Sequence, residues 1–384
     1  MIITADWLRD STSQALLGAL TEQGFEAYFV GGCVRNALLD APVSDLDVAT
    51  SARPEDVQNI MENKGFRTVP TGIEHGTITV LIQKNSFEVT SFRKDVETFG
   101  RRAVVAFSSD ITDDARRRDF TMNALYAGAD GRVVDPLNGL PDLIARRLRF
   151  IEDADRRIKE DYLRILRYFR FFAWYGDQSS GLDPEALAAI SDNLDGLDKL
   201  SKERIGAEIR KLLKAETPEM AFAAMEQTGV LQRILPGATT RSFAPLVHLE
   251  HQLGLPADWL RRLLVLGGEG LKAALRLSNA EATRVRQYHQ ANVQLLSPNV
   301  AAYRFGEDTG LDLALVQSAS LGLPVDPAVL AQIKQGAAAR FPVAAKDLQG
   351  FEGKALGDKL RELESAWIES GFTSSKADLL SGLS

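Results

Sequence analysis

The spacing of apolar residues changes several times within residues 1–140. Apolar runs of strand-like length and alternation predict strands at 26–32, 44–51, 76–83 and 85–93. Spacing of three to four residues predicts helices at 6–24, 33–40 and 52–65, and residues 119–136 are expected to continue as helix, strand, turn and strand. Because the strands follow one another without regular helical crossovers, we expect a mixed, largely antiparallel sheet with helices.

After about residue 141 the pattern becomes almost entirely helical. Apolar residues recur every three to four positions in the segments 141–151, 153–176, 183–198, 201–215 and 217–235. Residues 236–384 contain further helical patterns that are interrupted by Gly and Pro. The sequence therefore predicts an α+β protein, in which an N-terminal region with a sheet precedes an extended all-helical region.

Composition limits the class of protein. The chain has 384 residues, 45% of them hydrophobic and 25% charged, which is typical of a globular protein large enough for two or three packed units. The single cysteine, Cys33, gives no disulfide framework, and we expect it to be a small buried packing residue. No stretch is long and apolar enough for a membrane span, and the N-terminus lacks a secretory pattern. We therefore expect a cytoplasmic protein without membrane association.

The charge is distributed unevenly. The net charge is −7, but residues 146–170 carry nine Lys or Arg and only five acidic residues. A local basic surface can bind phosphates even when the whole protein is acidic. The alternative interpretation of such a run is a solvated helix face.

Two aspartates on a predicted strand indicate a metal site. Asp45 and Asp47 are separated by one residue, so they point to the same face of the strand. Such carboxylates repel each other unless a cation lies between them, and Mg²⁺ prefers oxygen ligands and substrate phosphates. Glu88 lies on a predicted strand that we expect beside this one, and it is the candidate third carboxylate. The alternative is an acidic, solvent-facing strand edge.

A glycine turn precedes these aspartates. Gly31 and Gly32 end one predicted strand and open a short helix, where the backbone can approach a phosphate. Arg35 follows on the first turn of that helix and can add guanidinium donors. The P-loop and dinucleotide-binding motifs are both absent. The glycine turn and the aspartates together predict a site for a triphosphate and a metal.

Two arginine-rich segments complete the candidate site. Residues 116–118 are three arginines, with Arg117 and Arg118 as candidate nucleotide ligands. They are expected to begin a helix, where their charge opposes the helix dipole unless an anionic ligand neutralises it, and the alternative is a disordered basic loop end. In residues 159–172, Asp161 and Arg164 are expected on one helix face. Arg167 and Arg170 are expected to continue the same face. The opposite face is expected to be apolar core, formed by Tyr162, Ile165, Leu166, Phe169 and Phe172.

An Asp–Arg pair can read the edge of a nucleobase. Cytosine and adenine both present an amine donor beside a ring-nitrogen acceptor, and uracil and guanine present the reverse order. The carboxylate of Asp161 would accept from the amine and the guanidinium of Arg164 would donate to the ring nitrogen, so C and A would be selected by roughly 1–3 kcal/mol. The alternative is an intrahelical salt bridge without a role in recognition.

These motifs together resemble those of the class II tRNA nucleotidyltransferases, which are the CCA-adding enzymes and bacterial poly(A) polymerases of the polymerase-β superfamily. The resemblance covers roughly residues 25–210 and rests on GG-x-V-R with D-x-D, RRDFT-x-NA and ED-x-x-R-x-L-R-x-x-RF, while SKERIGAEIRKLL resembles a later helix of the family. It places family metal and nucleotide positions at Gly32, Arg35, Asp45, Asp47, Arg118, Asp161, Arg164, Arg167 and Arg170. The family usually has aspartate where this chain has Asn36, and isoleucine where it has Met122.

The resemblance implies an organisation and an activity. The expected domains are a catalytic head at 1–140, a neck for nucleobase selection at 141–215, a body at 216–310 and a tRNA-binding tail at 311–384. The implied activity is template-independent addition of CCA to the 3′ end of tRNA from CTP and ATP, with release of pyrophosphate by two-metal phosphoryl transfer. Mg²⁺ is the expected cofactor, tRNA, CTP and ATP are the expected partners, and no protein partner is implied.

Several activities remain open within this scaffold. A poly(A) polymerase, or an enzyme that adds only CC or only A, is the first alternative. The long segment 93–115 ahead of RRDFT favours addition of all three nucleotides, and the absence of a His-Asp dipeptide argues against a phosphohydrolase domain. His248 and His251 are expected on a helix surface. A non-catalytic RNA or nucleotide sensor is the lower-ranked alternative, and the retained aspartates argue against it.

Overall fold

The computed structural model describes residues 1–99 and 102–381. The chain forms two compact units, Met1–Ile234 and Leu235–Ser384. The predicted boundaries at 140, 215 and 310 stay predictions. In the segment ahead of RRDFT, residues 100 and 101 lie outside the described residues. No helix of the described ranges combines the length and the apolar character needed to cross a membrane.

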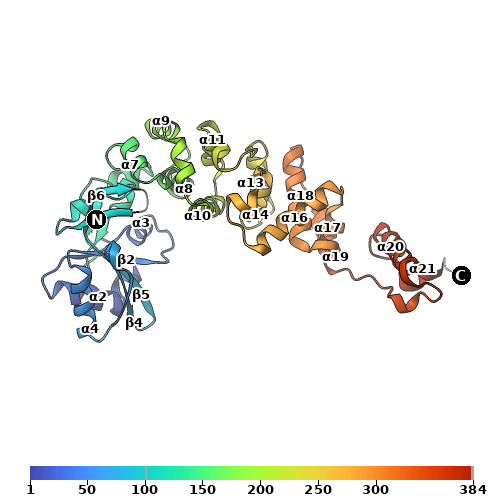
Figure 1. Cartoon of the computed structure of the whole chain (residues 1–384), viewed down its shortest axis with the longest axis horizontal. Helices are drawn as coiled ribbons and strands as arrows, with labels where there is room; N and C mark the ends of the chain where they lie inside the picture. Colours follow the sequence, from blue (N-terminus) through green and yellow to red (C-terminus); the bar gives the residue numbers. More distant parts are fainter. Residues whose placement is uncertain (100–101, 382–384) are drawn as a thin grey trace. The chain divides into compact units, whose positions relative to one another are not determined.

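A seven-stranded sheet organises the first unit (Figure 1), with the strand order β3-β4-β5-β2-β1-β8-β9. Its strands are β1 (Ala27–Val30), β2 (Leu46–Thr50), β3 (Arg67–Gly72), β4 (Thr77–Ile82), β5 (Asn85–Ser91), β8 (Tyr126–Ala127) and β9 (Val133–Val134). All neighbours pair antiparallel except β2 and β5, which are parallel. The predicted mixed, largely antiparallel sheet and the β4–β5 hairpin are confirmed. A separate two-stranded sheet pairs β6 (Arg93–Phe99) with β7 (Arg102–Phe107).

Short helices accompany these strands. They are α1 (Asp6–Arg9), α2 (Ser11–Thr21), α3 (Gly32–Leu38), α4 (Pro54–Asn63), η1 (Ile73–His75), α5 (Ile111–Arg116) and η2 (Thr121–Asn123). The prediction of one helix at 6–24 is wrong, because Asp10 leaves the helical conformation and its side chain accepts a hydrogen bond from the amide of Thr12, capping α2. The helix expected from residue 119 is also wrong, since only the single 3-10 turn η2 forms there.

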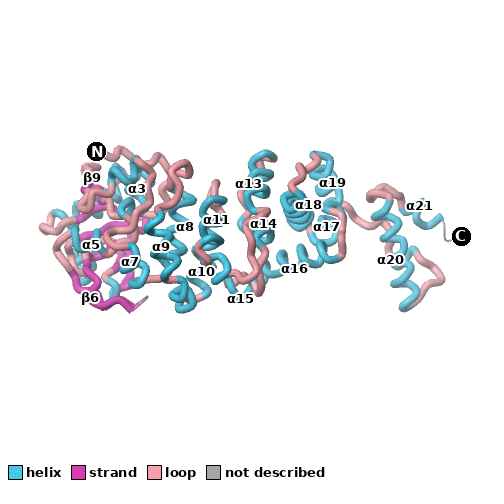
Figure 2. The backbone as a smooth tube through the Cα atoms, turned by 90° about the horizontal axis from the view of Figure 1, so that it is seen from above, coloured by secondary structure: helices cyan, strands magenta, loops and turns pink. Residues whose placement is uncertain are grey.

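Helices continue the first unit after the sheet. They are α6 (Leu140–Ile144), α7 (Ala154–Glu160), α8 (Leu163–Tyr175), α9 (Pro184–Asp192), η3 (Leu194–Lys199), α10 (Lys202–Leu213), α11 (Glu219–Gln227) and α12 (Val230–Ile234). Helices α8 and α10 lie side by side (Figure 2). Phe120 packs against Phe150 and against Phe171 of α8, with ring centroids 5.0 and 5.1 Å apart, and this aromatic cluster joins α8 to the strand region.

The predicted core face of α8 is largely confirmed. Ile165, Leu166, Phe169 and Phe172 are buried. Tyr162 is the exception, because it precedes the helix and is only half-buried. Its ring lies so close to Gly196 that a Cβ atom there would come within 1.8 Å of it, which explains the glycine.

The described part of the second unit is entirely helical. It consists of α13 (Phe243–Gln252), α14 (Trp259–Leu266), α15 (Leu271–Ala274), α16 (Asn279–Val293), α17 (Pro298–Phe305), α18 (Glu307–Leu321), α19 (Pro327–Ala338), η4 (Ala345–Asp347), α20 (Gly353–Glu369) and α21 (Lys376–Leu380). Buried ion pairs connect its helices, since Arg261 contacts both Glu250 and Asp312. His248 and His251 are exposed on α13, as predicted. The predicted α+β class with a helical C-terminal part is confirmed.

Candidate active site

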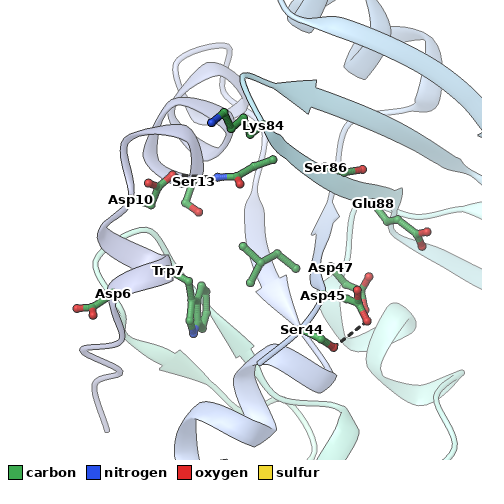
Figure 3. Close-up of a pocket in the computed structure, with 12 residues that line it drawn as sticks. Asp6, Trp7, Asp10, Ser13, Ser44, Asp45, Asp47, Lys84, Ser86 and Glu88 are labelled. Carbon is green, nitrogen blue, oxygen red and sulfur yellow. Dashed lines mark hydrogen bonds between the residues drawn. The ribbon is translucent and has the colours of Figure 1, made fainter. Parts of the chain in front are cut away.

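Three carboxylates on or next to two adjacent parallel strands line one cavity. Asp47 on β2 is the register partner of Glu88 on β5, so the expected adjacency of these strands is confirmed. Asp45 lies one residue ahead of β2 rather than within it, and its Oδ2 accepts a hydrogen bond from Ser44 Oγ at 2.9 Å. Figure 3 shows the two aspartates side by side, with Glu88 projecting from the neighbouring strand. The cavity has a volume of about 840 Å³.

The chemistry of these carboxylates fits a divalent cation. Burial raises the pKa of Asp47, and the charges of Glu88 and Asp45 raise it further, while Arg118 opposes them. Within residues 1–99 and 102–381, none of the three acids forms an ion pair, and no three or more His, Cys, Asp or Glu side chains are close enough to hold a metal by themselves. Mg²⁺ suits such a partial site, because it typically takes one or two carboxylates and completes its shell with water and substrate phosphates.

A second cavity, of about 420 Å³, contains most of the predicted nucleotide ligands. Asp47 lines this cavity as well as the first. The predicted residues that line it are Gly31, Gly32, Arg35, Arg117, Arg118, Asp161, Arg164 and Arg167. Arg170 does not line it, since its guanidinium forms an ion pair with Glu208 of α10 at 2.5 Å. Three further lining residues, Asp119, Asn123 and Phe171, had not been proposed as ligands from the sequence.

The glycine turn depends on a backbone conformation that other residues rarely adopt. Gly31 has φ 71° and ψ −118° and caps the start of α3. A Cβ atom at Gly31 would lie 3.4 Å from Nη1 of Arg118. The turn therefore brings the backbone and this guanidinium together at the wall of the second cavity.

The arginines at 116–118 end a helix instead of starting one. Arg116 is the last residue of α5 and Arg117 is its C-cap, so the prediction that these arginines begin a helix is wrong. At the C-terminal end of a helix the dipole favours their positive charge. Arg117 and Arg118 both pair with the fully buried Asp114, at 2.6 and 3.0 Å. Burial alone would raise the pKa of Asp114, but Arg118 and Arg117 outweigh it and lower the pKa to about 2.

Arg35 is buried without a carboxylate partner. Its Nη1 donates to Asn123 Oδ1 at 2.5 Å, and its Nη2 donates to Asn36 Oδ1 at 2.8 Å and to Tyr175 Oη at 2.9 Å. The guanidinium also stacks on the Tyr175 ring, 4.0 Å from the centroid. In the part of the chain that is described, Arg35 makes no ion pair, and burial lowers its pKa. Because an unpaired buried charge is costly, this site favours an anionic ligand.

Asp161 and Arg164 line the same cavity, but they do not share a helix. Asp161 is the C-cap of α7 and lies ahead of α8, which bears Arg164, so both the shared helix face and an intrahelical salt bridge are wrong. Arg164 pairs with Glu160 at 2.7 Å and donates to the backbone carbonyl of Arg117 at 3.0 Å. Asp161 instead accepts from Arg204 of α10, with Nη2 2.6 Å from Oδ2.

The remaining charges of this region are also largely paired. Arg167 binds Asp119 at 2.6 Å, and the other carboxylate oxygen of Asp119 accepts from Asn123 at 3.0 Å. Arg147 and Arg149 both pair with a buried aspartate, Asp142. The basic segment 146–170 is therefore not one continuous free surface. Arg164 and Arg167 of this segment line the second cavity, whereas Arg147 and Arg149 lie outside it and are largely exposed.

Comparison with known protein families identifies two segments. A profile described as "Poly A polymerase head domain" matches residues 27–149. A profile described as "Probable RNA and SrmB- binding site of polymerase A" matches residues 181–241. The first segment contains the sheet and the three carboxylates, and the second contains α10.

Similar curated proteins cover nearly the whole chain. The "CCA tRNA nucleotidyltransferase 1, mitochondrial" of Danio rerio is 33% identical over 383 residues, which cover 94% of this chain and 87% of the relative. The "CCA-adding enzyme" of Bacillus licheniformis is 32% identical over 381 residues, or 94% of each chain.

Solved structures share the architecture. The Bacillus stearothermophilus CCA-adding enzyme in complex with CTP matches with a TM-score of 0.69 and 27% identity, over 93% of this chain and 92% of that one. The Thermotoga maritima CCA-adding enzyme complexed with tRNA-CCA matches with a TM-score of 0.72 over 100% and 98% of the two chains. At 16% identity, this second match shows likeness of fold alone.

Proposed function

The chain belongs to the family of CCA-adding tRNA nucleotidyltransferases, and we propose that the two cavities lined by Asp47 are its active site. The enzyme adds C, C and A to the 3′ end of tRNA from CTP and ATP and releases pyrophosphate. Poly(A) synthesis and partial addition rank lower, because relatives that span nearly the whole chain are named for CCA addition. A non-catalytic sensor ranks lowest, since the acidic residues of the site are retained.

The observation that carries this proposal is the shared position of Asp47. It lines the cavity of the three carboxylates and also the cavity of the arginines and Asp161. A nucleotide whose base and phosphates occupy the arginine-lined cavity would therefore have its reacting phosphate beside the carboxylates. The acceptor hydroxyl of the RNA must reach the same carboxylates, so the two reactants would meet at Asp47.

Nucleotidyltransferases of this family use divalent metal ions, and we propose Mg²⁺ here. Asp45 and Asp47 would hold the metal, and Glu88 is the additional candidate beside Asp47. When bound, divalent ions would lower the pKa of the attacking ribose hydroxyl and neutralise charge on the leaving pyrophosphate. The unpaired carboxylates of the chain contribute oxygen ligands, and the partly buried setting of Asp47 limits competition by water.

Arg35 and Arg118 are proposed to bind the triphosphate. Arg35 brings a buried positive charge that no carboxylate of the described residues contacts. Arg118 is held by Asp114 beside the Gly31 turn, so its position is fixed before a nucleotide arrives. The neutral side chain of Asn36 accepts a hydrogen bond from Arg35, whereas the aspartate that the family usually has here would cancel the arginine's charge. With Asn36, the full positive charge of Arg35 remains available to the triphosphate.

Asp161 and Arg164 are proposed to read the base. Asp161 would accept a hydrogen bond from the amine of cytosine or adenine, and Arg164 would donate to the adjacent ring nitrogen. Arg204 holds one oxygen of Asp161, and the backbone amide of Leu163 donates to the other at 3.1 Å. These two bonds orient the carboxylate. The base-reading site therefore depends on the end of α7, on α8 and on α10.

Sequencing of the products tests this function directly. A tRNA that lacks its terminal CCA is incubated with all four nucleoside triphosphates, and the added nucleotides are read. We expect CCA, whereas an A-only tail, CC alone or no product would each contradict the proposal. Asp47→Ala should abolish incorporation, and Asp195→Ala, at a side chain 93% exposed, is the matched control that should not. Chelation followed by Mg²⁺ or Mn²⁺ addition tests the choice of metal.

We also propose a cytoplasmic location, supported by the single buried cysteine. Several relatives are named as mitochondrial proteins, so the compartment needs its own test. Fractionation of cells that express the tagged chain would decide, and enrichment in an organelle would contradict the proposal.

A further inference from the structure

Three side-chain bridges connect α8, with the turn before it, to α10. Asp161 binds Arg204 and Arg170 binds Glu208. The third bridge is formed by Trp174, whose Nε1 donates to the backbone carbonyl of Lys211 at 2.9 Å. Both residue numbers increase along the series, so the two helices run side by side in the same direction. The bridges therefore extend from the base-reading residues to Trp174.

Trp174 is unusually exposed for an aromatic side chain. It is 46% exposed, and among the described residues outside 95–105 no other Trp, Tyr or Phe is as exposed. No ring or cation of the same part of the chain stacks on it. The bond to the Lys211 carbonyl holds the indole in one orientation. An exposed, oriented ring without a stacking partner is suited to receive another flat group.

Two lysines lie at the end of α10 to which the indole of Trp174 is bonded. Lys211 is on the last turn of α10, and Lys214 is the C-cap of that helix. Both are exposed, and within the described residues neither forms an ion pair. Glu216 is the nearest acidic residue in the sequence after them, and it pairs with neither. Together, Trp174, Lys211 and Lys214 are called the Trp174 surface.

We propose that the Trp174 surface binds the unpaired 3′-terminal nucleotides of the acceptor RNA. Proteins that hold single-stranded nucleic acid combine an aromatic ring, on which a base stacks, with cations that follow the phosphates. Trp174 lies on α8 at positions i+7 and i+4 from Arg167 and Arg170, so it continues the stripe that begins at the nucleotide cavity. This inference rests on the proposed function, because it assigns a contact to the same RNA substrate.

Substitution of Trp174 tests the stacking role. A labelled minihelix RNA that ends in unpaired CC is used to measure AMP addition at saturating ATP and RNA binding by anisotropy. Trp174→Ala should raise the KM for RNA and the Kd of the minihelix about ten-fold or more. Trp174→Phe keeps a ring but loses the bond to Lys211, and it should stay within about three-fold of the wild type. The KM for ATP and the kcat at saturating RNA should not change.

The lysines are tested through the dependence of binding on salt. Removing both in Lys211→Ala/Lys214→Ala should make the slope of log Kd against log salt shallower by about 1.4, since each phosphate contact to a single strand contributes about 0.7. Lys202→Ala removes one lysine from the first turn of the same helix and is the matched control, which should leave the slope unchanged.

The outcomes separate this inference from the proposed function. A wild-type enzyme that adds no nucleotides would overturn the proposed function itself. A wild type that adds CCA, with RNA affinity unchanged in Trp174→Ala, would overturn only the Trp174 surface. Equal losses in Trp174→Phe and Trp174→Ala would also overturn it, because the hydrogen bond to α10 would then be the feature that matters. Equal weakening for a fully base-paired RNA end would exclude stacking on unpaired nucleotides.

Discussion

Arg204 is expected to control base selection although it does not line the nucleotide cavity. Its Nη2 lies 2.6 Å from Asp161 Oδ2, and the two side chains are 24% and 25% exposed. A charged hydrogen bond in this partly buried setting is worth about 1 kcal/mol, between the values of exposed pairs and of buried charged bonds. Without Arg204, the Asp161 carboxylate must be ordered by the base alone. Arg204→Ala should therefore reduce the preference for CTP over UTP up to about five-fold.

The assay is a competition between CTP and UTP on a minihelix that lacks CCA, and it measures the ratio of their kcat/KM values. Asp161→Ala removes the reading group itself and should reduce the ratio by about 5- to 150-fold, the equivalent of ~1–3 kcal/mol. Arg233→Ala is the matched control, since it breaks ion pairs with Asp195 and Asp198 on the exposed surface. The ratio in Arg233→Ala should equal that of the wild type.

A double substitution tests whether Arg204 acts through Asp161. If it does, adding Arg204→Ala to Asp161→Ala should change the selectivity no further, because the two effects are not additive. Arg204→Lys keeps the charge and should recover part of the selectivity. Unchanged discrimination in Arg204→Ala, or full additivity in the double variant, would refute the reasoning.

Three further predictions concern stability and catalysis. Asp47→Asn should lower incorporation roughly 100-fold or more, because a metal ligand is lost. The same change should raise Tm in metal-free buffer, because burial and Glu88 raise the pKa of Asp47 and so disfavour its charged form. A lower Tm would contradict this. Gly31→Ala should cost about 1–3 kcal/mol in unfolding free energy because of its φ of 71°, whereas Gly18→Ala, in a helix with no atom within 4 Å, should not destabilise. Because the pKa of Asp114 falls from 3.8 to about 2, its ion pairs should contribute about 2 kcal/mol that is present above pH 4 and lost as the pH falls through 2. Denaturant titrations at pH 5 and pH 2.5 should show that the unfolding free energy falls less between these pH values in Asp114→Asn than in the wild type.

Residues that act through strand geometry could be anticipated from the sequence. Asp45 and Asp47 lie side by side, as alternation predicted, although Asp45 immediately precedes β2, and the β4–β5 hairpin brings Glu88 beside Asp47. The glycine turn was recognisable because a strand that ends in two glycines requires an unusual backbone conformation. These features depend on short segments, whose local patterns determine their structure.

Features that depend on distant partners could not be anticipated in the same way. Asp161 is held by a residue 43 positions away, and only the packing of α10 against α8 brings them together. The only sequence signal was the ER pair in SKERIGAEIRKLL, which indicates a helix but not its neighbour. Helix α5 was not predicted, and its final arginines were expected to begin a helix, because Asp110 caps α5 within a charged segment without clear periodicity. The pairing of Arg35 with Tyr175 also depends on tertiary structure.

The unneutralised guanidinium of Arg35 has a consequence for the direction of the reaction. A site that lacks one negative charge attracts any polyphosphate, including the by-product that each addition leaves behind. Inorganic pyrophosphate should therefore rebind, slow turnover competitively with the nucleotide and, when abundant, drive removal of the terminal residue. Sustained repair of RNA ends by this enzyme would then depend on a separate hydrolase that destroys pyrophosphate as it is formed.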